Sequence, residues 1–380
     1  MSFVISGAGG NRLEARLSKP SSHPSPHFYC SKTADWFDVW LDVEQLLPGV
    51  IDCWTDNIKL LWNGTDETFS NNEGVETRVP CFGEVCGVEY LDTKVEVGGS
   101  AYFHAMIEAF AAEGYVRGES IVSAPYDFRY SPVGGTDGYG DRTVKLVEDL
   151  CEKNGGEKVL LVSHSMGGLW AHHLLVNQSA AWKEKHVHAW AALAPAYGGT
   201  ARELRLMASG DNEGVPFAEG STVREEQRSS ESNFWLLPNL SLWGEDEVII
   251  EAPGESYTAH ELRTTFWNGI GFPDGNQIYP RLESVFDLSD VGVRTLVKYG
   301  VGKDTPERYV YSQNADWDEK FITSVVMGDG DGTVNRRSLE AGLIMEWKGA
   351  IHEAFEGEDH QSIIKNEEVL KSLVAEGLGA

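Results

Sequence analysis

A serine with small neighbours lies where an apolar stretch of the sequence changes into a helix-like one. Residues 158–170 read KVLLVSHSMGGLW, so a run rich in Val and Leu leads to Ser165 and two glycines follow it closely. This order is typical of a nucleophile elbow, a sharp turn between strand and helix that exposes a serine hydroxyl for attack on a carbonyl carbon. Ser163 stands where the pattern G-x-S-x-G has its first glycine, and its small side chain is expected to fit. The segment predicts acyl-transfer chemistry at Ser165.

Attack on a carbonyl also needs donors for the negative charge that develops on the carbonyl oxygen. In an elbow, the residue after the nucleophile directs its backbone N–H at that oxygen, so Met166 is one predicted donor. Residues 6–11, SGAGGN, follow the apolar run FVIS and lack the Lys-Ser/Thr of a phosphate-binding loop. We interpret this glycine-rich loop as the source of the second donor, the backbone N–H of Ala8.

A serine nucleophile needs a general base and an acid that orients the base. In hydrolases with an elbow, the acid follows the nucleophile in the chain and precedes the histidine. The segment GDGDGTVN (328–335) follows the apolar run FITSVVM, and its glycines let one carboxylate turn back toward the site. Val334 stands where a calcium loop requires glycine, which argues against calcium. We predict Asp331 as the acid, with Asp329 as the alternative.

Two histidines follow these acids and could serve as the base. His352 lies inside the apolar run IHEAF, where we expect it to pack or to face solvent. His360 lies in the loop after that run, so it is the predicted base, with Asp331 fixing its tautomer. His164 is adjacent to Ser165, but on a sharp elbow its side chain points elsewhere, and we interpret it as structural.

Alternating strand-like and helix-like segments surround these residues. Apolar spacing predicts helices within 102–110 and 144–151, and strands within 120–128, 158–164 and 188–199. The alternation resumes in the segments RTLVKYG, FITSVVM and GAIHEAF. Such alternation predicts an α/β protein with a parallel sheet, here an α/β-hydrolase core.

Composition restricts the class of protein. The 380 residues are 41% hydrophobic and carry 31 Lys+Arg against 59 Asp+Glu, a net charge of −28. That charge argues against nucleic acid as a partner and against long-range attraction to anionic membranes at neutral pH. Apolar runs are too short to span a membrane. The apolar run FVIS begins two residues after Met1, so a cytoplasmic protein is expected unless an upstream signal peptide is missing.

Cysteine and asparagine patterns bear on metal binding and N-glycosylation. The five cysteines include no C-x-x-C pair, so no metal site is predicted. Three sequons for N-glycosylation begin at Asn63, Asn177 and Asn239. Asn177 is expected to be inaccessible at the end of the elbow helix, whereas the other two lie beside turn residues.

Two segments interrupt the alternation. The first is rich in Trp and Leu and lies between Cys30 and Cys53; its apolar residues at helical spacing suit either a buried core or a projection into a lipid interface. They are Trp36, Phe37, Trp40, Leu41, Leu46 and Leu47. The second, about 208–233, is polar and glycine-rich and ends in FWLLP. A loop of that length is usually functional, so we predict a mobile lid.

With these residues placed, the chain resembles the lecithin:cholesterol acyltransferase family, and most closely its lysosomal phospholipase A2 and plant phospholipase-like branches. The absence of a late cysteine pair makes the plasma acyltransferase branch a poorer match. The resemblance is carried, besides the segment between Cys30 and Cys53, by SGAGGNRLEARL (6–17), GVETRVPCFG (74–83), SAPYDFRYS (123–131), SHSMGG (163–168), REEQRSSESNFWLLP (224–238), GFPDG (271–275) and GDGDGTVN (328–335).

The resemblance implies an organisation and a site. It implies a hydrolase core formed by 1–29, 80–199 and 286–380, a membrane-binding subdomain at 30–79, and a cap at 200–285 that carries the lid. It also implies a Cys30–Cys53 disulfide, the triad Ser165, Asp331 and His360, and oxyanion donors at Ala8 and Met166.

The resemblance further implies removal of a fatty acyl chain from a glycerophospholipid through an acyl-serine intermediate. We therefore predict a serine phospholipase A, with transacylase activity toward lipid alcohols and no cofactor or metal. Its expected partner is the surface of a phospholipid bilayer, and a monomer is favoured. If a signal peptide is missing, the expected place is the lysosomal or vacuolar lumen, or outside the cell.

Three other functions stay open at this point. An O-acyltransferase acting on sterol or diacylglycerol would differ in its rates with alcohol and water as acceptors. A carboxylesterase would act equally on monomeric and bilayer substrates. A catalytically silent lipid-binding protein is opposed by the presence of the complete set of nucleophile, acid and base.

Overall fold

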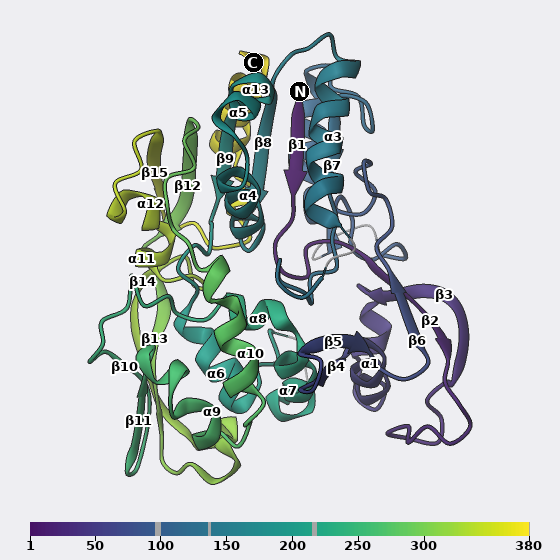
Figure 1. Cartoon of the computed structure of the whole chain (residues 1–380), viewed down its shortest axis with the longest axis vertical. Helices are drawn as coiled ribbons and strands as arrows, with labels where there is room; N and C mark the ends of the chain where they lie inside the picture. The colour runs from purple at the N-terminus through teal and green to yellow at the C-terminus, as the bar shows by residue number, and fades with distance from the viewer. Residues whose placement is uncertain (96–99, 136–137, 215–218, 380) are drawn as a thin grey trace.

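A parallel β-sheet forms the centre of the structure, a computed structural model that describes residues 1–95, 100–135, 138–214 and 219–379. In this part of the chain, six strands follow the order β15-β12-β9-β8-β1-β7 (Figure 1). Their bounds are β1 Ser2–Ile5, β7 Ile121–Ser123, β8 Val159–His164, β9 Val187–Leu193, β12 Thr295–Val301 and β15 Ala350–Glu356. All neighbouring pairs run parallel.

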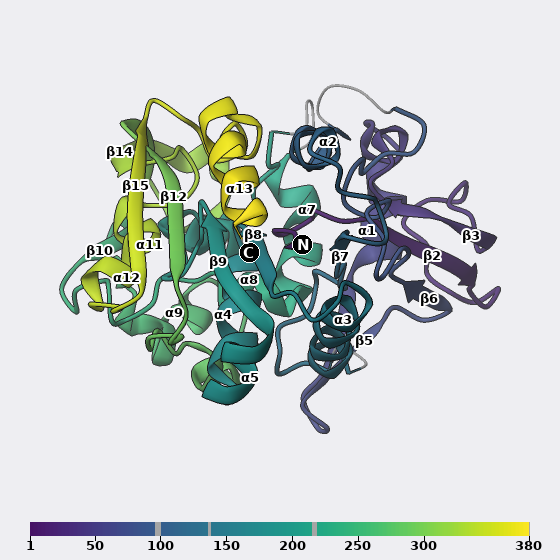
Figure 2. The same ribbon diagram turned by 90° about the horizontal axis from the view of Figure 1, so that it is seen from above.

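Helices cover both faces of this sheet. Figure 2 shows α2 (His104–Ala112) and α13 (Glu367–Leu378) on one face, and α3 (Tyr139–Lys153), α4 (Gly167–Val176) and α5 (Ala180–His186) on the other. Because both faces are covered, β8 is buried along its whole length, which explains its continuous run of apolar residues. The arrangement confirms the predicted α/β class.

A smaller antiparallel sheet lies beside the core, at the right of Figure 1. It has the order β3-β2-β6, formed by Thr33–Trp40, Leu13–Ser18 and Val75–Arg78. Near it lie the short helix η1 (Val43–Leu46), α1 (Ile51–Ile58), and a hairpin of β4 (Leu60–Asn63) and β5 (Thr68–Asn71). Several of these elements share an apolar cluster that includes Leu13, Val39 and Trp54.

The helical spacing predicted from Trp36, Phe37, Trp40 and Leu41 is wrong, because Thr33–Trp40 forms β3. A run of aromatic and β-branched residues this short fits either period, and pairing with β2 decides between them. The subdomain boundaries at 30 and 79 stay a prediction, and β2, from upstream of residue 30, pairs with both β3 and β6.

A four-stranded sheet with the order β11-β10-β13-β14 lies at the left of Figure 1. Its strands are β10 Val248–Ala252, β11 Glu255–Thr258, β13 Lys303–Tyr311 and β14 Ile322–Gly330. The alternation read at FITSVVM was therefore misplaced, because β14 pairs antiparallel with β13 and not with the central sheet. Between this sheet and the small one lie the helices α6 (Ala201–Ser209), α7 (Gly220–Ser229), α8 (Glu231–Trp235), α9 (Phe266–Gly269) and α10 (Gly275–Arg281).

Short elements complete the chain. They are η3 (His260–Arg263), η4 (Leu282–Val285), η5 (Ala315–Trp317), η6 (Glu319–Phe321), α11 (Arg336–Leu339), α12 (Ala341–Ile344) and η7 (Ile363–Lys365).

The segment 208–233 is not a continuous loop. It contains α7 and the start of α8, while residues 215–218 of the predicted lid lie outside the described residues. Sequence patterning missed α7 because its sequence, GSTVREEQRS, has no periodic apolar residues. Val223 is its only large apolar side chain that is buried. The cap boundaries at 200 and 285 stay a prediction.

Two disulfides occur among the described residues. Cys30–Cys53 has the pairing implied by the resemblance, and Cys81–Cys86 was not foreseen, because four intervening residues match no common metal or disulfide signature. The sequon predictions are partly wrong: Asn239 is buried and donates to the Phe286 carbonyl, whereas Asn63 and Asn177 are exposed. In the described ranges, every helix is too short or too polar to cross a bilayer.

Candidate active site

The backbone at Ser165 has the conformation of an elbow. Its φ is 56°, a left-handed value that a residue with a side chain rarely adopts. Ser165 joins the end of β8 to the start of α4, and the elements around it approach very closely. A Cβ on Gly167 would lie 2.6 Å from the Ile5 carbonyl oxygen, and one on Gly7 would lie 2.7 Å from Ser165 Cβ. Glycine is required at both positions, as the small-residue pattern predicted.

The three predicted triad residues meet at this turn. His360 Nε2 lies 2.9 Å from Ser165 Oγ, and His360 Nδ1 lies 2.7 Å from Asp331 Oδ2. Ser165 is partly exposed while Asp331 is fully buried. This geometry allows His360 to accept the hydroxyl proton of Ser165 while donating Nδ1–H to Asp331.

Backbone donors fix the orientation of Asp331. Its Oδ1 accepts from the N–H groups of Thr333 and Val334, at 3.0 and 2.7 Å. The His360 N–H in turn donates to the Asp331 carbonyl, at 3.0 Å. With one carboxylate oxygen held by the loop, the other is left to orient His360. Gly330 and Gly332, on either side of Asp331, let the chain fold back in this way.

The alternative acid and base lie elsewhere. Asp329 is on the surface, where it pairs with Arg336 at 2.8 Å and accepts from the Gly302 N–H at 2.7 Å. His352 lies in β15 against Tyr299, and its ring nitrogens have no hydrogen-bond partner in the described structure. Burial lowers the pKa of His352, which favours its neutral form.

Both predicted oxyanion donors lie next to the nucleophile. Met166 is buried at the start of α4, where backbone N–H groups point out of the helix end beside Ser165. Ala8 lies in the turn after β1, and this turn is held internally by the Gly10 N–H, which donates to the Gly7 carbonyl at 3.0 Å. The loop lies against the nucleophile, since a Cβ on Gly7 would lie 2.7 Å from Ser165 Cβ. The role of Ala8 as an oxyanion donor stays a prediction.

Trp40 was predicted to touch lipid, but the structure places it under the glycine-rich loop. Its indole Nε1–H donates to the Gly9 carbonyl at 2.6 Å, and its ring packs against Trp54 and Phe128. A Cβ on Gly9 would lie 3.0 Å from this ring. Nothing in the sequence linked residue 40 with the loop at residue 9, which only the tertiary fold brings together.

The other predicted lipid-facing residues differ in exposure. Trp36 is half-buried, and its ring packs against the guanidinium groups of Arg16 and Arg78. Phe37, Leu41 and Leu46 are also half-buried, whereas Leu47 is 55% exposed. Four further apolar side chains are exposed and were not among the predicted residues. Val43 and Val50 lie within the Trp- and Leu-rich segment, and Phe28 and Tyr29 lie just before Cys30.

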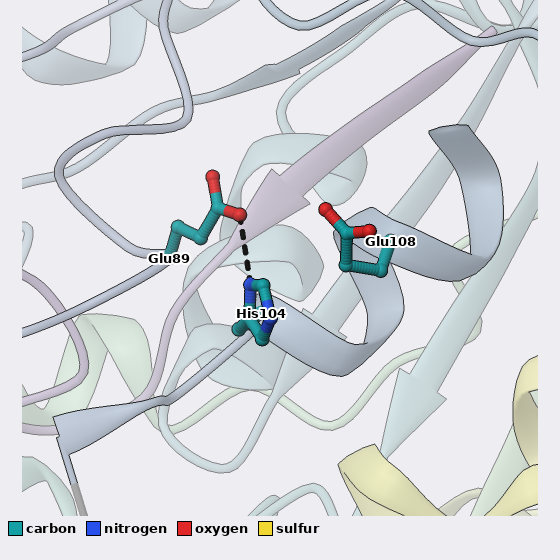
Figure 3. Close-up of side chains that lie close together, drawn as sticks. All are labelled: Glu89, His104 and Glu108. Carbon is teal, nitrogen blue, oxygen red and sulfur yellow. Dashed lines mark hydrogen bonds and ion pairs between the residues drawn. The ribbon is translucent and has the colours of Figure 1, made fainter. Parts of the chain in front are cut away.

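One group of side chains has the composition of a metal site. Glu89, His104 and Glu108 offer ligand atoms within 4.8 Å of one another (Figure 3). Arg117, however, donates hydrogen bonds to both glutamates. The guanidinium already supplies the positive charge that a metal ion would bring, and the cluster is interpreted as an ion-pair network.

Comparisons with known proteins show which family the chain resembles in sequence. A family model described as lecithin:cholesterol acyltransferase matches residues 36–284 and 278–372. A lysosomal phospholipase A and acyltransferase of Bos taurus is 38% identical over 97% of this chain and 89% of its own length. A phosphatidylcholine-sterol acyltransferase of Rattus norvegicus is 34% identical over 100% of this chain and 84% of its own length.

One solved structure has a similar fold. A chain in the crystal structure of a Tle4–Tli4 complex superposes with a TM-score of 0.61, covering 99% of this chain and 97% of that one. Its sequence identity of 13% limits this likeness to the fold.

Replacing the two neighbouring aspartates one at a time separates their roles. Asp331→Asn should lower kcat on a soluble ester by about 10⁴, because an amide at this position favours the wrong tautomer of His360. Asp329→Asn is the matched control, and kcat should change by less than about threefold, as for other surface substitutions. Steady-state kinetics of both variants would measure this, and equal losses would contradict the assignment of the acid.

Proposed function

Because the chain belongs to the lecithin:cholesterol acyltransferase family, we propose that it is a serine phospholipase A that also transfers the acyl group to alcohols. The observation that carries the proposal is the contact of Ser165, His360 and Asp331 at a strained turn. These groups supply a nucleophile, a base and an orienting acid, which is what cleavage of a carboxylic ester requires.

The first half of the reaction acylates the enzyme. Ser165 Oγ bonds to the ester carbonyl carbon while its proton passes to His360 Nε2. The carbonyl oxygen becomes an oxyanion, which the backbone N–H groups of Ala8 and Met166 stabilise. When the C–O bond of the ester breaks, His360 gives the proton to the departing glycerol oxygen. A lysophospholipid leaves, and the fatty acyl chain stays on Ser165.

The second half removes the acyl chain through the same groups. His360 takes a proton from water or from an alcohol, whose oxygen then bonds to the acyl carbon. The ester bond to Ser165 breaks, and Oγ regains a proton from His360. Water yields a free fatty acid and an alcohol yields a new ester, so phospholipase and acyltransferase activities share one intermediate.

Contact with a bilayer forms a second part of the proposal. It is supported by the exposed apolar side chains near the Cys30–Cys53 disulfide, namely Phe28, Tyr29, Val43, Leu47 and Val50. Side chains of this kind bind membranes by inserting into the interface between headgroups and acyl chains. Insertion without positive charge suits a chain whose net charge is −28.

The disulfides and the lysosomal relatives fit a lumenal or secreted protein. The lysosomal or vacuolar lumen is the proposed place within that range. Support comes from buried glutamates of the cap, whose burial raises the pKa of their carboxyl groups. For Glu226, burial raises it to about 7, and the pKa of Glu231 is also raised. Such groups favour the folded state in acid.

The direct experiment compares the wild type with Ser165→Ala on phosphatidylcholine liposomes, with and without an added lipid alcohol. Ser165-dependent release of fatty acid is expected, and the acylated alcohol should appear at the expense of fatty acid. Loss of the hydroxyl should lower turnover by about 10⁶, since the triad acts as a unit. Absence of any Ser165-dependent product would contradict the proposal.

Exposed apolar residues can be tested apart from the chemistry. Leu47→Ser combined with Val50→Ser should weaken binding to phosphatidylcholine vesicles about tenfold or more, because each buried leucine or valine side chain contributes roughly 1.5 kcal/mol or more. Hydrolysis of a short soluble ester should stay within about twofold. Leu343→Ser is a control, since Leu343 is 56% exposed on α12, away from this segment. Unchanged vesicle sedimentation of the double variant would count against this contact.

Protein stability should depend on pH through Glu226. The pKa of Glu226 is about 7 in the folded protein and lies near its usual value of 4.5 in the unfolded chain. The folded state therefore binds the proton more tightly. The resulting stability is fully present below about pH 4.5 and is lost as the pH rises through 7, by about 3 kcal/mol.

The midpoint temperature of thermal unfolding should accordingly change less between pH 5 and pH 7.5 for Glu226→Gln than for the wild type. The amide keeps an oxygen that can accept from Ser230, as the carboxyl does now. Glu225→Gln is the neighbouring control, because the Glu225 side chain is 81% exposed. A wild type that is more stable at pH 7.5 than at pH 5 would speak against an acidic working environment.

A further inference from the structure

Two buried side chains that the reaction steps above do not use connect the glycine-rich loop with the catalytic histidine. The Gly7 N–H donates to the Tyr102 hydroxyl at 3.0 Å, and this hydroxyl lies 2.5 Å from His164 Nδ1. On the other edge of the imidazole, His164 Nε2 lies 2.8 Å from the backbone carbonyl oxygen of His360. A continuous chain of hydrogen bonds thus runs from the loop to the base.

The direction of every hydrogen bond in this chain is determined. His164 is fully buried, and burial, together with nearby His360, lowers its pKa to about 3, so its ring is neutral and carries one proton. The His360 carbonyl can only accept, so that proton is on Nε2. Nδ1 is then an acceptor, and the Tyr102 hydroxyl must donate to it. The hydroxyl oxygen remains to accept the Gly7 N–H.

Packing leaves the loop little freedom around Tyr102. A Cβ on Gly10 would lie 2.7 Å from Tyr102 Cζ, and one on Gly7 would lie 3.0 Å from the Tyr102 hydroxyl oxygen. The phenol ring therefore fits against the loop only because both positions are glycine. Burial raises the pKa of Tyr102, so the hydroxyl stays protonated and keeps its role as donor.

We propose that Tyr102 and His164 are positioning residues that hold the glycine-rich loop in register with His360. Gly7 is adjacent to Ala8, whose N–H is a proposed oxyanion donor, so the proposal rests on the proposed function and deepens it. Oxyanion donors act only at about 2.7–3.1 Å from the developing charge. A loop released at Gly7 would lose this distance while the substrate could still bind.

The test removes one hydroxyl. Tyr102→Phe keeps the ring but leaves the Gly7 N–H and His164 Nδ1 without a partner. On a soluble p-nitrophenyl ester, kcat should fall about 10- to 100-fold, which is no more than the decrease caused by removing one oxyanion donor. KM should stay within about twofold of the wild-type value. Tyr139→Phe is the matched control, because Tyr139 is another buried tyrosine whose hydroxyl donates to a backbone carbonyl, that of Ala124. Its kcat should stay within about threefold of the wild type.

A double-variant cycle shows whether Tyr102 and His164 act through one hydrogen-bonded chain or through two separate packing effects. His164→Leu should lower kcat as Tyr102→Phe does, and the double variant should be no slower than the slower single variant, within about threefold. His164→Gln, which retains a donor and an acceptor, should recover most of the activity lost in His164→Leu. The proposal would be overturned if the decreases in kcat of the two single variants multiplied in the double variant. It would also be overturned if Tyr102→Phe had the kcat of the wild type, or if only KM changed.

The same assay separates this proposal from the proposed function. If the wild type hydrolyses the ester no faster than Ser165→Ala, the proposed function fails. If hydrolysis depends on Ser165 and Tyr102→Phe is as fast as the wild type, only the positioning role of Tyr102 and His164 is contradicted.

Discussion

The left-handed backbone at Ser165 is the constraint on which the rest of the site depends. A residue with a side chain held at a φ of 56° costs on the order of 1–3 kcal/mol and persists only where its surroundings enforce it. Here the enforcing contacts are the buried strand β8 before it, α4 after it, and the glycine contacts at Gly7 and Gly167. A larger residue at either glycine would push the loop or the helix away from the nucleophile.

The acid and the base are positioned by one strand of the central sheet. β12 pairs with β15, and His360 lies in the loop that follows β15. β12 also continues through Gly302 into β13, which pairs with β14, and Asp331 directly follows β14. A Cβ on Gly300 in β12 would lie 2.1 Å from the Glu358 carbonyl oxygen, so the histidine loop lies directly on this strand. The four-stranded sheet therefore positions Asp331, the proposed acid.

The sequence predicted the parts of the site that depend on local pattern and on chain order. Ser165 follows from an apolar run and two glycines, and Asp331 and His360 follow from their order after it. The α/β class followed from the alternation of segments. The disulfide pairing and the membrane-binding subdomain were implied by the resemblance, which alone did not distinguish buried from exposed residues within that segment.

What the sequence did not predict depends on contacts between distant segments. By residue type, Trp40 fits a surface that inserts into a membrane. Its indole instead donates to the carbonyl of Gly9, which lies in the turn between β1 and β2. The spacing of apolar residues from Trp36 to Leu41 was interpreted as helical. Their strand conformation depends on pairing with β2, which the local sequence does not reveal. Tyr102 gave no signal at all, since its role arises where its hydroxyl meets Gly7 and His164.

Mass spectrometry of the trapped enzyme would show whether Ser165 carries the acyl group. The wild type would be mixed with phosphatidylcholine liposomes, quenched in acid within one turnover and digested, and the peptide that contains Ser165 would be weighed. A mass increase equal to one fatty acyl group is expected on that peptide in the wild type and not in Ser165→Ala. Release of fatty acid with the Ser165 peptide unmodified, or acylation at another residue, would contradict it.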